Sequence, residues 1–168
     1  MRKVIIVDYN EQWPGLFAAE SSLLQITLGK VISRIHHIGS TSVPGLAAKP
    51  VIDIMLEVVG LSELDNCHSA MEQAGYTARG ENGIPNRRYF IKGGNQRSHH
   101  VHAFTVGDMQ IVKHLAFRDY LIKNKKAADE YVEIKRAAAL ASENDIHRYS
   151  ALKAAFIENH LRLAQACT

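Results

Sequence analysis

The segment that decides the fold runs from residue 35 to residue 55 and reads IHHIGSTSVPGLAAKPVIDIM. The apolar residues up to Ile38 predict a strand over 31–38, and Gly39 with Ser40 predicts a turn at its end. A short connection then leads into a second predicted strand, 51–59, which carries Asp53 inside an otherwise apolar run. Because a charged side chain in such a run needs a partner, Asp53 is the first candidate functional residue.

The order of strand, Gly-Ser turn and strand with an acid suits a phosphate ligand. Glycine lets the backbone approach a ligand closely, and the amides and hydroxyls of Gly39, Ser40 and Thr41 can donate hydrogen bonds to phosphate oxygens. An aspartate on the neighbouring strand can hold a divalent cation that bridges the same phosphates. Lys49, which precedes the second strand, is a further candidate for phosphate binding.

Residues 37–54 closely resemble the signature of the GrpB family, which is assigned to the polymerase-beta-like nucleotidyltransferase superfamily. Other segments that resemble family landmarks extend the resemblance over almost the whole chain: Trp13-Pro14, His100-Val101-His102, 117–121, Tyr131 with Lys135, and Tyr149 with Lys153 and Phe156. The resemblance implies that Lys135, Tyr149 and Lys153 face the cleft and bind the nucleotide. Family members that are fused to dephospho-coenzyme A kinase point to a link with coenzyme A metabolism.

The fold implied by this resemblance is α+β, a nucleotidyltransferase-like mixed β-sheet with helices packed on it and a C-terminal helical segment, in a single domain over residues 1–168. The pattern divides this domain into a sheet part, 1–109, and a helical part, 110–168. In the sheet part we expect helices over 14–29 and 62–75 and a hairpin over 88–106 that turns at Gly93-Gly94-Asn95. In the helical part apolar residues recur at helical spacing, which predicts helices over 111–123, over 126–142 and from Asp145 onward. Asp145 is a suitable N-cap for the last of these helices.

The sequence departs from the superfamily pattern at one position. Nucleotidyltransferases of the superfamily carry two acids one residue apart on the strand, and two carboxylates at that spacing can hold a pair of Mg²⁺ ions. Here the second position is Met55. Glu57 lies on the same predicted face, but at ~3.3 Å per residue it is about 13 Å from Asp53 along the strand and cannot share its ion. The two-metal site is therefore incomplete.

Histidines gather where this acid is missing. Five of the nine histidines lie in two predicted strand segments: His36, His37, His99, His100 and His102. The other four fall in predicted helical segments, where they need no functional explanation. By alternation His100 and His102 share one face, whereas His99 points the other way. With Asp53 they could hold Zn²⁺, Mn²⁺ or Fe²⁺, or they could hold a phosphate or act as general acid and base. His37, beside the turn, is a better candidate than His36.

Basic residues cluster on the predicted hairpin and on the segment before it: Arg79, Arg87, Arg88, Lys92 and Arg97. They are either a charged, solvated sheet edge or a gate for an anionic substrate, and Arg88 is the candidate that we place in the site.

Composition excludes several classes of protein. With 46% hydrophobic and 22% charged residues, the 168-residue chain is typical of a globular protein. No segment approaches the ~18 apolar residues of a membrane span, and no signal peptide is recognisable, so we expect a cytoplasmic location. A net charge of +3 with few interleaved aromatic residues makes nucleic acid an improbable partner.

Three functions stay open. The first is metal-dependent nucleotidyl or phosphoryl transfer to a small acceptor, with Asp53 on Mg²⁺ or Mn²⁺ and a histidine as base. The second, which Met55 favours, is a non-catalytic module that binds a nucleotide or another anion. The third is a metal-dependent hydrolase on the same scaffold, with Asp53, His100 and His102 as the metal ligands, in which case Zn²⁺ suits the site.

Overall fold

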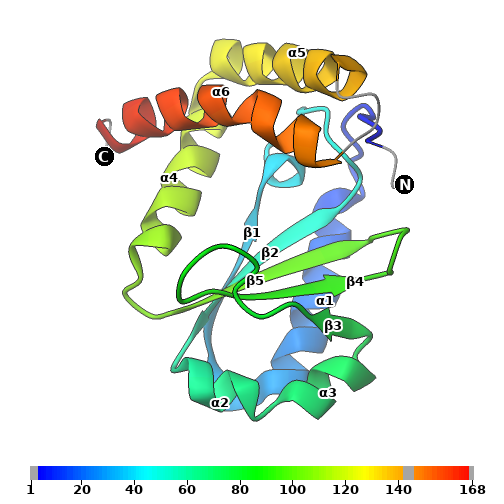
Figure 1. Ribbon diagram of the computed structural model, residues 1–168, viewed down its shortest axis with the longest axis vertical. Coiled ribbons are helices and arrows are strands. Elements are labelled where there is room, and N and C mark those ends of the chain that lie inside the picture. The colour runs from blue at the N-terminus through cyan, green and yellow to red at the C-terminus, as the bar shows by residue number, and fades with distance from the viewer. Residues whose placement is uncertain (1–3, 142–145, 167–168) are drawn as a thin grey trace.

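The computed structural model of the chain describes residues 4–141 and 146–166 and contains a five-stranded mixed sheet with helices packed on it (Figure 1). The strands lie in the spatial order β1 (Ile32–Ile38), β2 (Ile52–Val58), β5 (His99–Thr105), β4 (Arg88–Lys92) and β3 (Tyr76–Ala78). Neighbouring strands are antiparallel except β2 and β5, which are parallel. The predicted α+β fold with a mixed sheet is confirmed.

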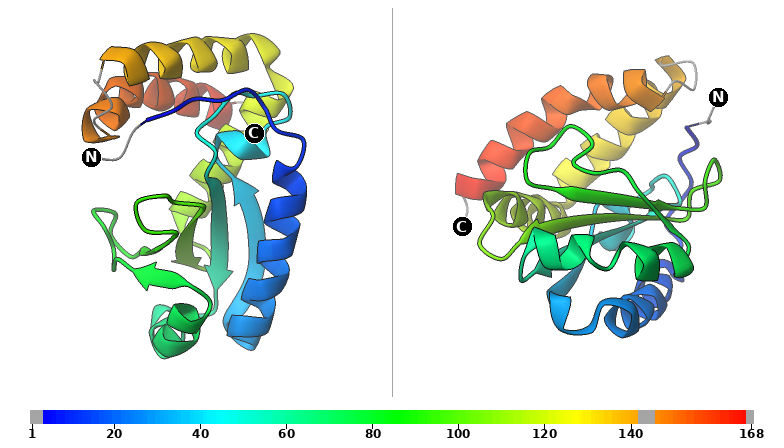
Figure 2. Two further views of the ribbon diagram at one scale, coloured as in Figure 1. Left: turned by 90° about the vertical axis from the view of Figure 1, so that its right-hand side faces the viewer. Right: turned by 60° about the horizontal axis from the view of Figure 1, so that its bottom comes forward.

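Three helices cover one face of the sheet: α1 (Trp13–Leu28), α2 (Leu61–Asp65) and α3 (His68–Gln73). Figure 2 shows α1 running along this face. Side chains alternate along β2, so that Ile52, Ile54, Leu56 and Val58 point to these helices and pack into the largest apolar cluster. Asp53 and Met55 therefore point to the opposite face.

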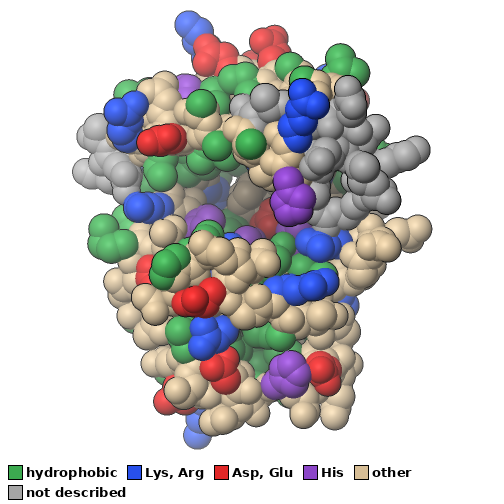
Figure 3. All heavy atoms as spheres, in the orientation of Figure 1, with side chains coloured by type: hydrophobic (Ala, Val, Ile, Leu, Met, Phe, Trp, Pro, Cys, Tyr) green, Lys and Arg blue, Asp and Glu red, His purple; other side chains and the backbone are tan. Residues whose placement is uncertain are grey.

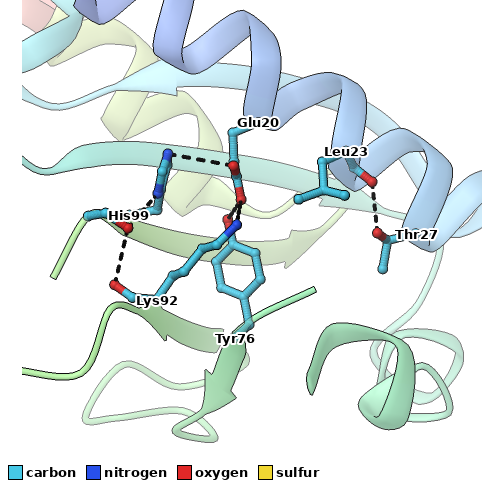
Figure 4. A network of polar contacts seen from close by, with 7 residues as sticks. Glu20, Leu23, Thr27, Tyr76, Lys92 and His99 are labelled. Carbon is cyan, nitrogen blue, oxygen red and sulfur yellow. Dashed lines mark hydrogen bonds and ion pairs between the residues drawn. The ribbon is translucent and has the colours of Figure 1, made fainter. Parts of the chain in front are cut away.

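A buried polar network ties α1 to the β4–β5 hairpin (Figure 4). Glu20 is 7% exposed, and its Oε1 accepts hydrogen bonds from the Tyr76 hydroxyl at 2.6 Å and from Lys92 Nζ at 2.7 Å. Its Oε2 lies 3.7 Å from Nε2 of His99. Burial opposes the charge of Glu20, but the bonds from Lys92 and Tyr76 hold its pKa below the usual value. Lys92 and His99 are paired in register, so the network fixes the end of the hairpin.

The single helix predicted over 62–75 is wrong, because the structure has α2 and α3 there. At Cys67 the amide donates to the carbonyl of Leu64, three residues back, at 2.9 Å, while the Cys67 thiol lies 3.5 Å from the carbonyl of Glu63, four residues back. The thiol thus occupies the carbonyl of Glu63, which the amide of Cys67 would have bonded in a continuous α-helix. Leu64 and Met71 are buried as the pattern indicates, whereas His68 is exposed.

Three longer helices follow the last strand: α4 (Met109–Lys123), α5 (Lys125–Ala141) and α6 (Ile146–Ala166). Asp108 caps α4 by accepting a hydrogen bond from the amide of Gln110 at 2.8 Å. The predicted cap Asp145 lies outside the described residues. α4 packs on the second face of the sheet, and α5 and α6 lie together beyond its upper end in Figure 1. No helix among the described residues combines the length and the apolar character needed to cross a membrane, and the cytoplasmic location stays a prediction.

Candidate functional site

A cavity of 610 Å³ lies between the second face of the sheet and helices α5 and α6, a size typical of small-molecule sites. Figure 3 shows a hollow between the sheet part and the helices, with histidine and basic side chains near it. Ten of the eleven residues that the sequence assigned to the site line this cavity: Gly39, Ser40, Thr41, Lys49, Asp53, His100, His102, Lys135, Tyr149 and Lys153. Residues more than 100 positions apart are thus brought together, while the chemical roles assigned to them stay predictions.

Arg88 is the exception, and its placement in the site was wrong. Its Nε and Nη2 donate to the two carboxylate oxygens of Asp65 at 2.9 and 3.1 Å, an arrangement that raises the pKa of the guanidinium. Because the two planar groups match, this bidentate pair holds the side chain away from the cavity. Of the other basic residues of the hairpin region, Arg79 and Arg97 line the cavity.

The turn after β1 brings the backbone against Asp53. Gly39 has φ 72° and ψ −175°, a conformation that is open essentially to glycine alone. A Cβ at this position would lie 2.7 Å from Oδ2 of Asp53, closer than side chains approach one another. The residues that follow form a short 3₁₀ turn (Ser40–Ser42), in which the Ser42 amide donates to the Gly39 carbonyl at 3.1 Å. Glycine is therefore required for both the turn and the close approach.

Parallel pairing of β2 with β5 places the expected triad on one face. Asp53 is in register with His100, and Met55 is in register with His102. Oδ1 of Asp53 lies 3.4 Å from Nδ1 of His100 and 3.2 Å from Nε2 of His102. Burial raises the pKa of Asp53, but the hydrogen bonds from the two histidines outweigh it and hold the pKa well below the usual range. Asp53 is therefore ionised and accepts from both imidazoles.

Arg87 fixes the tautomer of His102 through a contact that sequence reasoning missed. The buried guanidinium lies with Nη1 3.3 Å from Nδ1 of His102 and donates to the carbonyls of Glu81 and Asn82 at 3.1 and 2.9 Å. A guanidinium is only a donor, so Nδ1 must accept and the proton of His102 lies on Nε2. A chain of two hydrogen bonds therefore connects Arg87 to His102 and His102 to Asp53.

The donor set does not fit the two Mg²⁺ ions of the superfamily. Met55, at the position of the second acid, is fully buried against Ile38, Phe104 and Ile111. Glu57 lies 2.5 Å from Nε2 of His36 and so has its own partner. Among the described residues, no three or more His, Cys, Asp or Glu side chains are placed to hold a metal ion. The expected ligand set Asp53, His100 and His102 is assembled as a hydrogen-bonded group.

Helices α5 and α6 each contribute the same pair to the cavity, a tyrosine followed four residues later by a lysine. Nζ of Lys135 lies 4.7 Å from the ring centre of Tyr131, and Nζ of Lys153 lies 4.7 Å from that of Tyr149. Residues at this spacing are neighbours on a helix surface, so each ring lies beside its cation. Lys49 also lies over Tyr149, at 5.1 Å.

The lysines have strongly lowered pKa values. Lys135 is 2% exposed, and its Nζ donates to Oγ of Ser40 at 2.8 Å and to the carbonyl of Ala47 at 2.7 Å. Burial, followed by the charges of Lys153 and Lys49, lowers its pKa to about 7. Burial and the charge of Lys49 lower the pKa of Lys153 to about 8. Bringing these cations together is unfavourable, and an anion between them would relieve the cost.

Three histidines depart from expectation. His37 points to α1, where it stacks on Phe17 and its Nε2 lies 2.9 Å from Oγ1 of Thr41; it supports the turn from behind, and burial lowers its pKa to about 4. His114 on α4 packs 5.9 Å from the ring of His102, and His147 on α6 lines the cavity. Of the four helical histidines that were set aside, one therefore reaches the cavity and one packs on a site histidine.

Loop residues complete the far wall of the cavity. Asn82 and Asn95 come from the segments before β4 and between β4 and β5, and Tyr89 comes from β4 itself. Asn82 has φ 47°, a conformation that asparagine tolerates better than most residues. Apart from turn-forming composition, the sequence holds no signal that these residues reach the site.

Comparison with known proteins identifies the family. The family described as GrpB protein matches residues 3–163. The UPF0157 protein YqkA of Bacillus subtilis is 46% identical over 88% of the chain, which spans only 43% of that relative. The crystal structure of the conserved protein GrpB from Enterococcus faecalis is 38% identical, covers 95% of this chain and 96% of its own, and superposes with a TM-score of 0.90. A dephospho-CoA kinase of Mycolicibacterium paratuberculosis is 27% identical over 95% of the chain, which spans 46% of that enzyme.

The fold itself is shared more widely. A cytoplasmic RNA terminal U-transferase is only 10% identical, yet it matches 89% of this chain and 46% of its own with a TM-score of 0.58. The architecture is therefore similar to nucleotidyltransferase-type folds. With a family match over nearly all its length and a close structural relative, the chain belongs to the GrpB protein family.

Proposed function

We propose that the protein binds a nucleotide through its phosphates in the cavity between the sheet and helices α5 and α6. The observation that carries the proposal is the charge of the wall: among the described residues that line the cavity, five are Lys or Arg and one, Asp53, is a carboxylate. Cationic walls of this kind attract and hold polyanions, and a cavity with low-dielectric walls focuses the field. The nucleotide is the expected anion because the scaffold is of the nucleotidyltransferase type.

The phosphates would lie at the Gly39–Ser42 turn. Gly39 opens the backbone there, and the amides and hydroxyls of Ser40 and Thr41 are suitable donors for phosphate oxygens. Lys49 and Lys153 line the same cavity and would act as cationic ligands. Lys135 has a second role besides its charge, because two of its three N–H groups hold Ser40 and Ala47 in place.

Nucleotidyl transfer to a small acceptor, aided by one Mg²⁺ or Mn²⁺ ion, is the second candidate function. It is favoured by one observation: both histidines contact Oδ1 of Asp53, while Oδ2 faces the Gly39 turn where phosphates would lie. Magnesium often binds through one carboxylate and the phosphates of a substrate. A hydrolase with His100 and His102 as metal ligands is less well supported, because Nε2 of His102 donates to Asp53 and Nδ1 accepts from Arg87.

Calorimetric titration with ATP, GTP, CTP and UTP tests the proposal, with and without Mg²⁺ or Mn²⁺. We expect at least one nucleotide to bind, and Lys153→Met to weaken its binding while Lys125→Met, on the exposed surface, leaves it unchanged. Pyrophosphate release that is lost in Asp53→Asn would support the transferase. Failure of all four nucleotides to bind under either condition would refute nucleotide binding. A purified protein that carries Zn²⁺ lost in His100→Ala would instead favour the hydrolase.

The similarity to a dephospho-CoA kinase suggests which nucleotides to include. Because that relative is named a dephospho-CoA kinase, dephospho-coenzyme A and coenzyme A should be added to the titration. Both carry a phosphorylated adenosine that fits the proposed recognition of phosphates. Binding of either in preference to the four nucleoside triphosphates would connect the protein with coenzyme A metabolism.

A further inference from the structure

The proposed function leaves open what neutralises the phosphate charge. Nucleotide enzymes commonly use Mg²⁺ for this purpose, whereas this cavity has one carboxylate and several lysines. We propose that the cavity binds nucleotide phosphates without a metal ion, and that Lys49, Lys135 and Lys153 supply the positive charge that a metal would otherwise bring. This inference rests on the proposed function and says how the phosphates are held.

Asp53, the one carboxylate among the described residues of the cavity wall, already has hydrogen-bond donors and a buried cation near it. Asp53 accepts from Nε2 of His102 at 3.2 Å, and His102 in turn accepts from the buried guanidinium of Arg87 at 3.3 Å. The neutral imidazole therefore connects a buried cation to the carboxylate. His100, with Nδ1 at 3.4 Å from the same oxygen, adds a second donor. A metal ion at Asp53 would find Oδ1 already accepting from these two donors and would be left with Oδ2 alone of this carboxylate.

Two of these lysines, Lys135 and Lys153, lack a carboxylate partner in the part of the chain that the structure describes. Among the described residues, Lys135 and Lys153 form no ion pair with Asp or Glu. Lys135 uses two N–H groups on neutral oxygens and keeps the third, and Lys153 lies over the ring of Tyr149. Two cations that are largely withdrawn from water and face neutral groups are prepared for an anionic ligand.

Tyr149 provides an independent indication of a ligand. Its side chain is fully buried at the wall of the cavity, and its hydroxyl is buried with no hydrogen-bond partner among the described residues. Buried hydroxyl groups nearly always have a partner in proteins. A phosphate oxygen held by Lys49 and Lys153, which lie over the same ring, would be an acceptor of the right chemistry for this hydroxyl.

The charge of the wall also agrees with a metal-free nucleotide. A free nucleoside triphosphate carries roughly four negative charges, about two of them on its terminal phosphate. Mg²⁺ would cancel two of these charges and leave the cationic wall overcompensated. The wall has five basic residues and one acid, so it matches the free polyphosphate better than the magnesium complex.

Calorimetry with ATP and with inorganic tripolyphosphate as probes tests this inference, in EDTA and in excess Mg²⁺ at equal ionic strength. We expect both probes to bind in EDTA and ATP to bind several-fold more weakly when Mg²⁺ is in excess. Lys49→Met and Lys153→Met should each weaken binding about tenfold, whereas the same substitution at the exposed Lys125 should have no effect. Lys49 and Lys153 are chosen because Lys135, which also holds the turn, is needed for folding.

The outcomes separate the two proposals. Binding that appears only with Mg²⁺, or that survives in both lysine variants, would overturn the metal-free inference and leave nucleotide binding intact. Failure of ATP and tripolyphosphate to bind under either condition would overturn both. Binding of tripolyphosphate in EDTA with the same loss in both variants supports the inference even if the protein prefers another nucleotide.

Discussion

The contact between Gly39 and Asp53 can be tested by adding a single methyl group. In Gly39→Ala the new Cβ would lie 2.7 Å from Oδ2 of Asp53, and the residue would keep φ 72° and ψ −175°. Such backbone strain costs about 1–3 kcal/mol. To clear the methyl group, Asp53 must move away from His100 and His102, and losing one hydrogen bond to a charged group costs about 1.5–3 kcal/mol. Together these make the variant less stable by about 2.5–6 kcal/mol.

Gly45→Ala is the matched control, because Gly45 lies in the same loop with φ 80° and has open space around its Cβ position. It should lose only the backbone contribution of about 1–2 kcal/mol. Urea denaturation followed by circular dichroism gives the free energy of unfolding of both variants. Equal losses in the two variants would refute the argument, because they would mean that the approach of Gly39 to Asp53 is not tight. A Gly39 variant that fails to fold while the Gly45 variant folds would agree with it.

Three further predictions concern the lysines and the two buried networks. The pKa of Lys153 is about 8 in the folded protein, against an ordinary value of 10.5, so between these two pH values the unfolded chain binds more protons than the folded one. The free energy of unfolding should therefore rise with pH over this range, and it should rise less in Lys153→Met. Anion binding should weaken as the pH passes 8, because Lys153 then loses its charge. Denaturation and calorimetry at pH 7–10 check both. Glu20→Gln should lower the free energy of unfolding by about 2–4 kcal/mol, because Lys92 loses a buried partner, while Glu72→Gln on the surface should change it little; equal effects would contradict the network. Arg87→Met should lower the free energy of unfolding by about 2–4 kcal/mol and shift the ¹⁵N resonances of His102. A proton on Nδ1 of His102 in the unaltered protein would contradict the assigned tautomer.

The main strands of the site and the shared face of its two histidines could be predicted from the sequence, because both follow from short-range rules. Alternation places His100 and His102 on one face, whereas their approach to Asp53 required in addition that their strand pair with that of Asp53, which the structure shows. The tyrosine and lysine pairs of α5 and α6 were identified by resemblance alone. Nothing in their spacing distinguishes Lys135, which is buried, from the exposed lysines on the same helix.

What could not be predicted depends on contacts between distant side chains. Glu20 looks like an ordinary surface acid in a helix, yet Tyr76 and Lys92 bury it. Arg87 and Arg88 are adjacent and identical, yet alternation sends the first to His102 and the second to Asp65. Only the pairing of β4 with β5 decides which of the two approaches the site.

The parallel pairing of β2 with β5 has a consequence for folding. Two strands that pair in parallel cannot be joined by a tight turn, so Asp53 contacts His100 only after the long connection between β2 and β5 has returned the chain to the same end of the sheet. Such non-local pairing slows folding. The cavity also needs Lys135 and Lys153 from α5 and α6, which are the last helices along the chain. No early fragment of the chain can therefore hold an anion in this way. The moment at which a refolding sample first binds tripolyphosphate would mark the docking of α6 and would time the last step of folding directly.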